Sequence, residues 1–144
     1  MKRNYVTVLN HKFLPQLMAL HESMLAHCGD FCLYIVCVDN LLYRQLQTIE
    51  LPYVHLVDME EIEAKNQRMA RIKSSRNTRE YCWTLSSFSF SIVKGIWSDI
   101  KELTYIDTDI YFFANPENIF TEFEDSGKEI LITEHDFLPE YEYL

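Results

Sequence analysis

The chain has 144 residues, of which 48% are hydrophobic and 14% aromatic, with only three glycines and four prolines. This composition supports the core of one domain over residues 1–144, and it excludes a disordered chain, a collagen-like repeat and a disulfide-stapled miniprotein. The formal net charge of −9 disfavours a general nucleic-acid-binding protein.

The N-terminal segment predicts a strand followed by a helix. Residues 5–9 (YVTVL) are rich in β-branched residues, which favour a strand. A helical stripe then runs from Leu14 to Cys28, and Gly29 stands where a helix commonly ends. The start of the chain lacks the apolar stretch of a signal peptide, and no apolar run approaches the roughly 18 residues of a membrane span. We therefore expect a cytoplasmic protein without a transmembrane segment.

The next segment repeats the alternation of strand and helix. Residues 31–38 (FCLYIVCV) are continuously apolar, which indicates a strand covered on both faces. A short helix is expected over 41–50 and a third strand over 53–57. Asp58, with Glu61 three residues later, resembles a capping box, and it predicts a helix that runs into the following basic segment.

Charge is distributed unevenly along the chain. The stretch AKNQRMARIKSSRNTR (64–79) carries six cations and no anion, whereas residues 99–144 hold 13 acidic and two basic side chains. A basic segment that faces an acidic region is typical of a site for phosphate and metal. A solvated helix would have the same composition, so both interpretations stay open.

The second half of the chain predicts a long helix, two strands and a short helix. Residues 78–97 fit a helix with Thr78 as its N-cap, although part of this stretch also alternates like a strand. Residues 102–116 (ELTYIDTDIYFFANP) predict a fourth strand, Asn115 and Pro116 a cap for a short helix, and residues 129–133 a fifth strand. This order predicts an α/β fold with a Rossmann-like, mainly parallel sheet and helices on both faces.

The cysteines indicate buried free thiols. None of them forms a CxxC pair or has a histidine at zinc-site spacing. Without a secretion signal, we expect no disulfide among Cys28, Cys32, Cys37 and Cys82.

Polar residues follow each predicted strand at the edge where parallel sheets bind ligands. Taken singly, each of them is also an ordinary turn residue or helix cap. They are Asn10 and His11, Asp39 and Asn40, Asp58, Asp107 and Asp109, and His135 and Asp136.

Asp107 and Asp109 interrupt an otherwise apolar run. On an extended chain their carboxylates point to the same side about 6.6 Å apart. Their repulsion is then about 2.5 kcal/mol at an effective dielectric constant near 20. A divalent cation would compensate this repulsion, and carboxylate oxygens suit Mg²⁺ or Mn²⁺.

Three segments together resemble a known family. The run YIDTDIYFFANPENIF (105–120) resembles the Asp-x-Asp segment of the GT-A glycosyltransferases, the nucleotide-diphospho-sugar transferases. The stretch REYCWTLSSF (79–88) resembles the helix that precedes this segment, and EILITEHDFLPE (129–140) resembles the strand that follows it. The resemblance spans most of the chain.

The resemblance implies the donor-binding portion of a transferase that takes a sugar from a nucleotide donor, with UDP-sugars favoured. Asp107 and Asp109 would bind Mn²⁺ or Mg²⁺ and, through it, the diphosphate. Asn10 and Asp39 match positions that contact the nucleoside. His135 is a candidate third metal ligand.

The positive charges of Arg76 and Arg79 make these two residues further candidates to bind the diphosphate. GT-A domains usually exceed 200 residues, so we expect the C-terminal acceptor-binding half to be missing. The acceptor, a glycan or another molecule, is not indicated. No catalytic base is assigned, although Glu134 and Asp136 are candidates.

Three other functions are alternatives to this one. A phosphohydrolase would carry its Asp-x-Asp pair at the end of the first strand, and a nucleotidyltransferase would have a glycine-rich loop where this chain has NHKFLPQ (10–16). A non-catalytic module is the third alternative. The aromatic tail FLPEYEYL (137–144) would then be an edge where a missing half or another chain docks.

Overall fold

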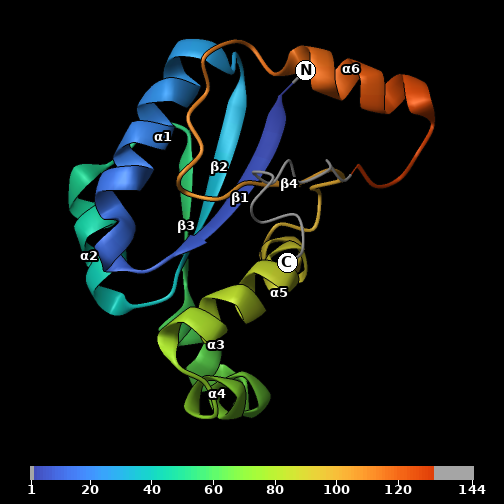
Figure 1. Ribbon diagram of the computed structural model, residues 1–144. Helices are drawn as coiled ribbons and strands as arrows, with labels where there is room; N and C mark the ends of the chain where they lie inside the picture. The colour runs from blue at the N-terminus through green and yellow to red at the C-terminus, as the bar shows by residue number, and fades with distance from the viewer. Residues whose placement is uncertain (1, 132–144) are drawn as a thin grey trace, which may run out of the picture.

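Four parallel strands form the sheet of this protein, in the order β3-β2-β1-β4 (Figure 1). The computed structural model describes residues 2–131. Its architecture is α/β and Rossmann-like, as the alternation of strands and helices predicts. The strands are β1 (Arg3–Leu9), β2 (Phe31–Cys37), β3 (Val54–Asp58) and β4 (Thr104–Tyr105).

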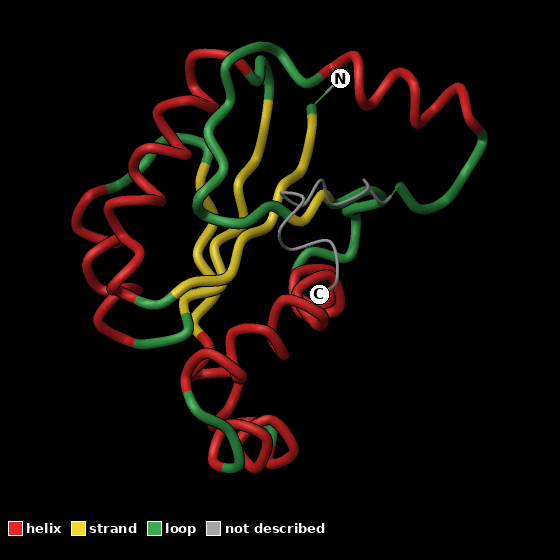
Figure 2. The backbone as a smooth tube through the Cα atoms, viewed as in Figure 1, coloured by secondary structure: helices red, strands yellow, loops and turns green. Residues whose placement is uncertain are grey.

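Helices cover both faces of the sheet (Figures 1 and 2). On one face lie α1 (Leu14–His27) and α2 (Asn40–Ile49), and on the other lie α3 (Met59–Lys65), α4 (Gln67–Ser74) and α5 (Thr78–Ile96). A short 3-10 helix, η1 (His11–Phe13), joins β1 to α1, and α6 (Glu117–Ser126) follows β4.

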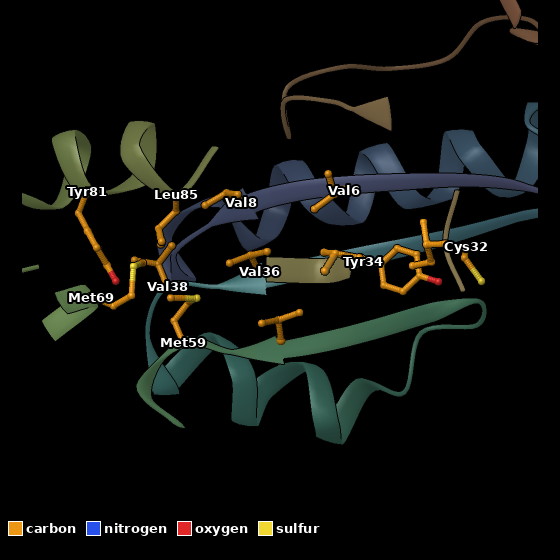
Figure 3. Packing of buried hydrophobic residues seen from close by; sticks show 13 residues of the cluster. Val6, Val8, Cys32, Tyr34, Val36, Val38, Met59, Met69, Tyr81 and Leu85 are labelled. Atoms are coloured by element: carbon orange, nitrogen blue, oxygen red, sulfur yellow. The ribbon is translucent and has the colours of Figure 1, made fainter. Parts of the chain in front are cut away.

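The core consists of two apolar layers, one on each face of the sheet. Successive residues of a strand point to opposite faces, so β2 sends Leu33 and Ile35 toward α1 and α2. Tyr34 and Val36 point toward the α3–α5 side and belong to the same buried cluster as Leu85 of α5, which lies near Val8 and Val38 (Figure 3). All seven residues of β2 are buried, which confirms the strand covered on both faces.

The cysteines are free thiols, as expected from their spacing. Cys28, Cys32 and Cys37 are buried and Cys82 is half-buried. None of the helices within residues 2–131 is long and apolar enough to cross a membrane.

Two helix boundaries differ from the sequence-based prediction. The helix that begins after Asp58 ends at Lys65, because Asn66 starts a new helix by accepting hydrogen bonds from the N–H groups of Arg68 and Met69. The N-cap of α5 is Asn77 and not Thr78. Asn77 and Glu80 form a reciprocal capping box, at 3.0 and 2.9 Å.

The predicted fourth strand over 102–116 was wrong in its length. Only Thr104 and Tyr105 pair with β1, and the chain then turns away, with a hydrogen bond from Ile110 N–H to the Asp107 carbonyl. Two of the apolar side chains that suggested a strand, Ile106 and Phe112, pack from a loop against the core layer under α1. Ile110, Tyr111 and Phe113 are exposed. Residues 129–131 are also not a strand, and the rest of the predicted fifth strand lies outside the described residues.

A candidate nucleotide cavity at the carboxyl ends of the strands

A cavity of about 880 Å³ opens at the carboxyl ends of β1 and β2, beside α4, α5 and the segment that follows β4. Parallel strands end at one edge, and this is where α/β sheets bind ligands. Four of the five residues predicted to contact the nucleotide sugar line this cavity, although they lie up to 69 positions apart in the sequence: Asn10, Asp39, Arg76 and Arg79. The fifth, Asp107, does not line it.

Asp39 is held rigidly at the end of β2. Its Oδ1 accepts the Leu42 N–H at 2.9 Å, which caps α2. Its Oδ2 accepts two hydrogen bonds from His11, from the backbone N–H and from the ring Nδ1, each at 3.0 Å. Burial opposes ionisation of Asp39, but the hydrogen bonds from Leu42 and His11 outweigh it and lower the pKa of this carboxyl.

Two arginines line the cavity from the α4–α5 region: Arg76 in the turn between these helices and Arg79 in the first turn of α5. Lys73, which also lines the cavity, is already paired with Glu63 at 2.6 Å. Arg76 donates a hydrogen bond to the Thr84 hydroxyl. Within residues 2–131, neither Arg76 nor Arg79 has an ion-pair partner, so both guanidinium groups are free to bind an anion.

Aromatic rings that no sequence motif identified also line the cavity. Trp83 is 64% exposed and Phe13 is 45% exposed. Trp83 lies four residues after Arg79 on α5, a spacing that places both side chains on one helix face. That spacing is the signal that could have identified Trp83. Exposed rings in a cavity offer flat apolar surfaces to a base or a sugar.

Tyr105 connects the Asp-x-Asp segment to α5. Its hydroxyl donates to Asp107 Oδ1 at 2.7 Å and lies 2.9 Å from Ser86 Oγ. Burial raises the pKa of the Tyr105 hydroxyl to about 12; the bond to Ser86 acts against this rise and the bond to Asp107 adds to it. The hydroxyl therefore stays protonated and keeps Asp107 in place.

Asp107 and Asp109 are exposed on the loop after β4, not within a buried strand as predicted. Thr108, the residue between them, lines the cavity, so the pair lies at its margin. In the described part of the chain, no three His, Cys, Asp or Glu side chains gather as metal ligands. Two carboxylates nevertheless suit a Mg²⁺ or Mn²⁺ ion that takes its other ligands from substrate phosphates and water. His135, Glu134 and Asp136 lie outside the described residues.

Comparison with known proteins found relatives but no matching family model. Two proteins of Bacillus subtilis are similar to this chain over 96% of its length: the uncharacterized protein YfnD, at 32% identity over 138 residues, and the uncharacterized protein YfnF, at 31% over 139. The matched region is 43% of YfnD and 45% of YfnF, so the chain spans less than half the length of these relatives.

Proposed function

We propose that this chain is the donor-binding portion of a metal-dependent glycosyltransferase, and that it binds a nucleoside diphosphate sugar, with a UDP-sugar as the favoured donor. The observation that carries this proposal is the single cavity shared by Asn10, Asp39, Arg76 and Arg79 at the carboxyl ends of the strands. The resemblance of residues 105–120 to the GT-A Asp-x-Asp segment supplies the reaction class.

In this function Arg76 and Arg79 bind the diphosphate from one side, because both line the cavity and neither has an ion-pair partner in the described chain, a property that Lys12 of the same lining shares. Asp107 and Asp109 would hold Mn²⁺ or Mg²⁺ on the other side. The metal would supply Lewis-acid stabilisation of the departing nucleoside diphosphate. Cations placed where negative charge grows stabilise the transition state more than the ground state.

The acceptor-binding half and the catalytic base then belong to sequence beyond this portion, as the greater length of YfnD and YfnF suggests. That half, or another chain, would dock onto this domain. A cytoplasmic location is part of the same proposal.

Calorimetry with a panel of UDP-sugars tests the proposal. We expect binding in Mn²⁺ and a loss of most of the affinity in EDTA. Arg79→Gln should weaken binding about tenfold or more, because a hydrogen bond between charged groups is worth about 1.5–3 kcal/mol. Arg71→Gln is the matched control, since Arg71 belongs to the same basic segment but does not line the cavity. Equal affinity in Mn²⁺ and EDTA would contradict the proposal.

A non-catalytic module that only binds nucleotide sugars is the second candidate function. It is favoured by the cavity lining, because Asp39, the one carboxylate among the described lining residues, already accepts N–H donors at both oxygens. Release of UDP from the donor in Mn²⁺, followed over time with this portion joined to its acceptor-binding half, separates the two: an enzyme releases UDP by transfer to water, whereas a binding module leaves the donor intact.

A further inference from the structure

A second hollow lies on α5, next to the nucleotide cavity. Its volume is about 360 Å³, and six side chains of the α4–α5 turn and of α5 line it: Arg76, Glu80, Trp83, Thr84, Ser87 and Phe88. Arg76 and Trp83 also line the nucleotide cavity. The two spaces therefore adjoin, and these two side chains belong to the wall that they share.

Two exposed aromatic rings border the hollow. Trp83 is 64% exposed and Phe88 is 42% exposed. Neither ring belongs to the two buried clusters or to the partly buried side chains packed against them, so the core does not use them. Water against an exposed ring is unfavourable, and a ligand with an apolar face would displace it.

Polar groups in the hollow are fixed by contacts within the α5 region. Glu80, Thr84 and Ser87 share one face of the helix, because they are spaced by four and three residues. The Arg76 guanidinium donates to the Thr84 hydroxyl, and Glu80 Oε2 accepts the Asn77 N–H at 2.9 Å. Within residues 2–131, Glu80 Oε1 accepts no hydrogen bond, and Arg76 has further N–H donors. The hollow thus offers a fixed acceptor and a fixed donor beside two rings.

We propose that this hollow binds a saccharide ring and is a subsite for the acceptor. A pyranose carries C–H groups on its faces, which pack against aromatic rings, and hydroxyl groups on its rim, which both donate and accept hydrogen bonds. Trp83 and Phe88 match the faces, and Glu80 matches a hydroxyl. The inference rests on the proposed function, since an acceptor must lie next to the donor, and it adds the chemical class of the acceptor.

Other classes of ligand fit this hollow less well. A purely apolar ligand would cover the Glu80 carboxylate without giving it a hydrogen bond, which is costly. An anionic ligand would be repelled by the Glu80 charge, and this repulsion offsets the attraction of Arg76. A neutral ligand with hydroxyl groups avoids both costs.

Fluorine NMR of the protein labelled with 5-fluorotryptophan tests the proposal without a substitution. The chain has two tryptophans. Trp83 lies in the hollow, whereas Trp97 packs against Tyr34 and His55, with ring centroids 4.9 and 5.5 Å away. Maltose, cellobiose, lactose and chitobiose are titrated with and without saturating UDP and Mn²⁺. Glycerol, which has hydroxyl groups and no ring, is the control.

We expect at least one disaccharide to shift the Trp83 resonance with a Kd on the order of 1 mM, while the Trp97 resonance stays unchanged. No shift with any of the four disaccharides would overturn the inference. Displacement of the saccharide by UDP would also overturn it, because the saccharide would then occupy the nucleotide cavity. Calorimetry of UDP on the same sample keeps the two proposals apart: no binding of UDP would overturn the proposed function, and the acceptor role with it.

Phe88 and Phe90 provide a matched pair of variants. Both are 42% exposed on α5, but Phe88 lines the hollow and Phe90 lines neither space. Phe88→Ser should weaken saccharide binding about tenfold and leave the UDP affinity unchanged, whereas Phe90→Ser should bind both ligands like the parent protein. Ser87→Arg, which fills the hollow from an exposed position, should have the same effect as Phe88→Ser and decides the matter if Phe88→Ser does not fold. Undiminished saccharide binding in these variants would overturn the inference.

Discussion

The Tyr105 hydroxyl donates a hydrogen bond to Asp107, whereas the Tyr105 ring contributes to packing. Removal of the hydroxyl alone therefore tests its role at the site separately from folding. Partners that orient a ligating carboxylate typically change metal affinity 10- to 100-fold when they are removed. We expect Tyr105→Phe to weaken Mn²⁺ binding in the presence of UDP by roughly tenfold or more, as measured by electron paramagnetic resonance of free Mn²⁺. The loss of one hydroxyl contact should cost about 1 kcal/mol of stability or less.

Ser86→Ala provides the graded control for Tyr105. Ser86 contacts the Tyr105 hydroxyl and not Asp107, so its removal should have a smaller effect on Mn²⁺ affinity. Unchanged Mn²⁺ affinity in Tyr105→Phe would show that the hydroxyl does not orient a metal ligand.

Asp109 presents the opposite case, an exposed carboxylate without a side-chain partner among the described residues. Asp109→Asn should lower Mn²⁺-dependent UDP affinity. It should leave the metal-free melting temperature unchanged or slightly higher, because it removes repulsion with Asp107. Calorimetry and thermal unfolding in EDTA measure the two effects, with Asp125→Asn on α6 as the control. A large drop in metal-free stability would assign Asp109 a structural role instead.

At the scale of elements, the local sequence pattern correctly predicted the strand and helices that form through local interactions. The continuous apolar run of β2 and the capping signals at Asp58 and near Asn77 were sufficient to predict their elements. The prediction of a long fourth strand failed because a distant partner holds this segment as a loop: the Phe112 N–H donates to Ser23 Oγ on α1, 89 positions away. Only tertiary structure reveals such a contact.

The candidate site likewise contains residues that the sequence predicted and residues that it did not. Asn10 and Asp39 followed from the rule that parallel strands end at one edge, and Arg76 and Arg79 followed from charge. Trp83 resembled an ordinary core aromatic in the sequence, because its exposure depends on how α5 lies on the sheet.

Helix α6 is held by one buried arginine and by Phe120, whose ring centroid lies 6.0 Å from that of Tyr5 in the core. Arg3 is 5% exposed, pairs with Glu117 and with Glu124 at 2.7 Å, and lies 4.4 Å from the centre of the Phe120 ring. α6 has no buried residue of its own. The bond from Arg3 lowers the pKa of Glu117 from its ordinary value of 4.5. The pairing therefore stabilises the folded state above pH 4.5, and this stability is lost as the pH falls through the lowered value.

We therefore expect α6 to lose amide-exchange protection below pH 4.5 before β2 does, measured by hydrogen exchange at several pH values. Arg3→Met should remove that protection already at pH 7. Lys65→Met removes the exposed pair with Glu61 and should change little, since surface pairs contribute about 0–1 kcal/mol. Protection of α6 that is independent of both pH and Arg3 would contradict this account.

At the scale of the whole molecule, the net charge opposes the binding of an anionic ligand, and the basic segment 64–79 offsets it beside the cavity. The net charge is −9, and 13 of the 22 acidic residues lie in 99–144. A nucleoside diphosphate is itself an anion, so only local cations and a bound metal draw it in. The Debye length is about 8 Å at 0.15 M salt, so distant acidic residues are largely screened there while contacts inside the cavity are not.

Raising the salt concentration above 0.15 M should therefore weaken UDP binding, because the remaining electrostatic interaction is the attraction of the cavity cations. The affinity measured by calorimetry in Mn²⁺ between 0.15 and 0.5 M NaCl should fall, and it should fall less steeply in Arg79→Gln, which has one cation fewer at the site. Arg71→Gln has the same change in net charge without a change in the cavity, so it should keep the parent slope. Identical slopes in the three proteins would mean that Arg79 does not bind the phosphates, and the charge of α5 would then serve solubility alone.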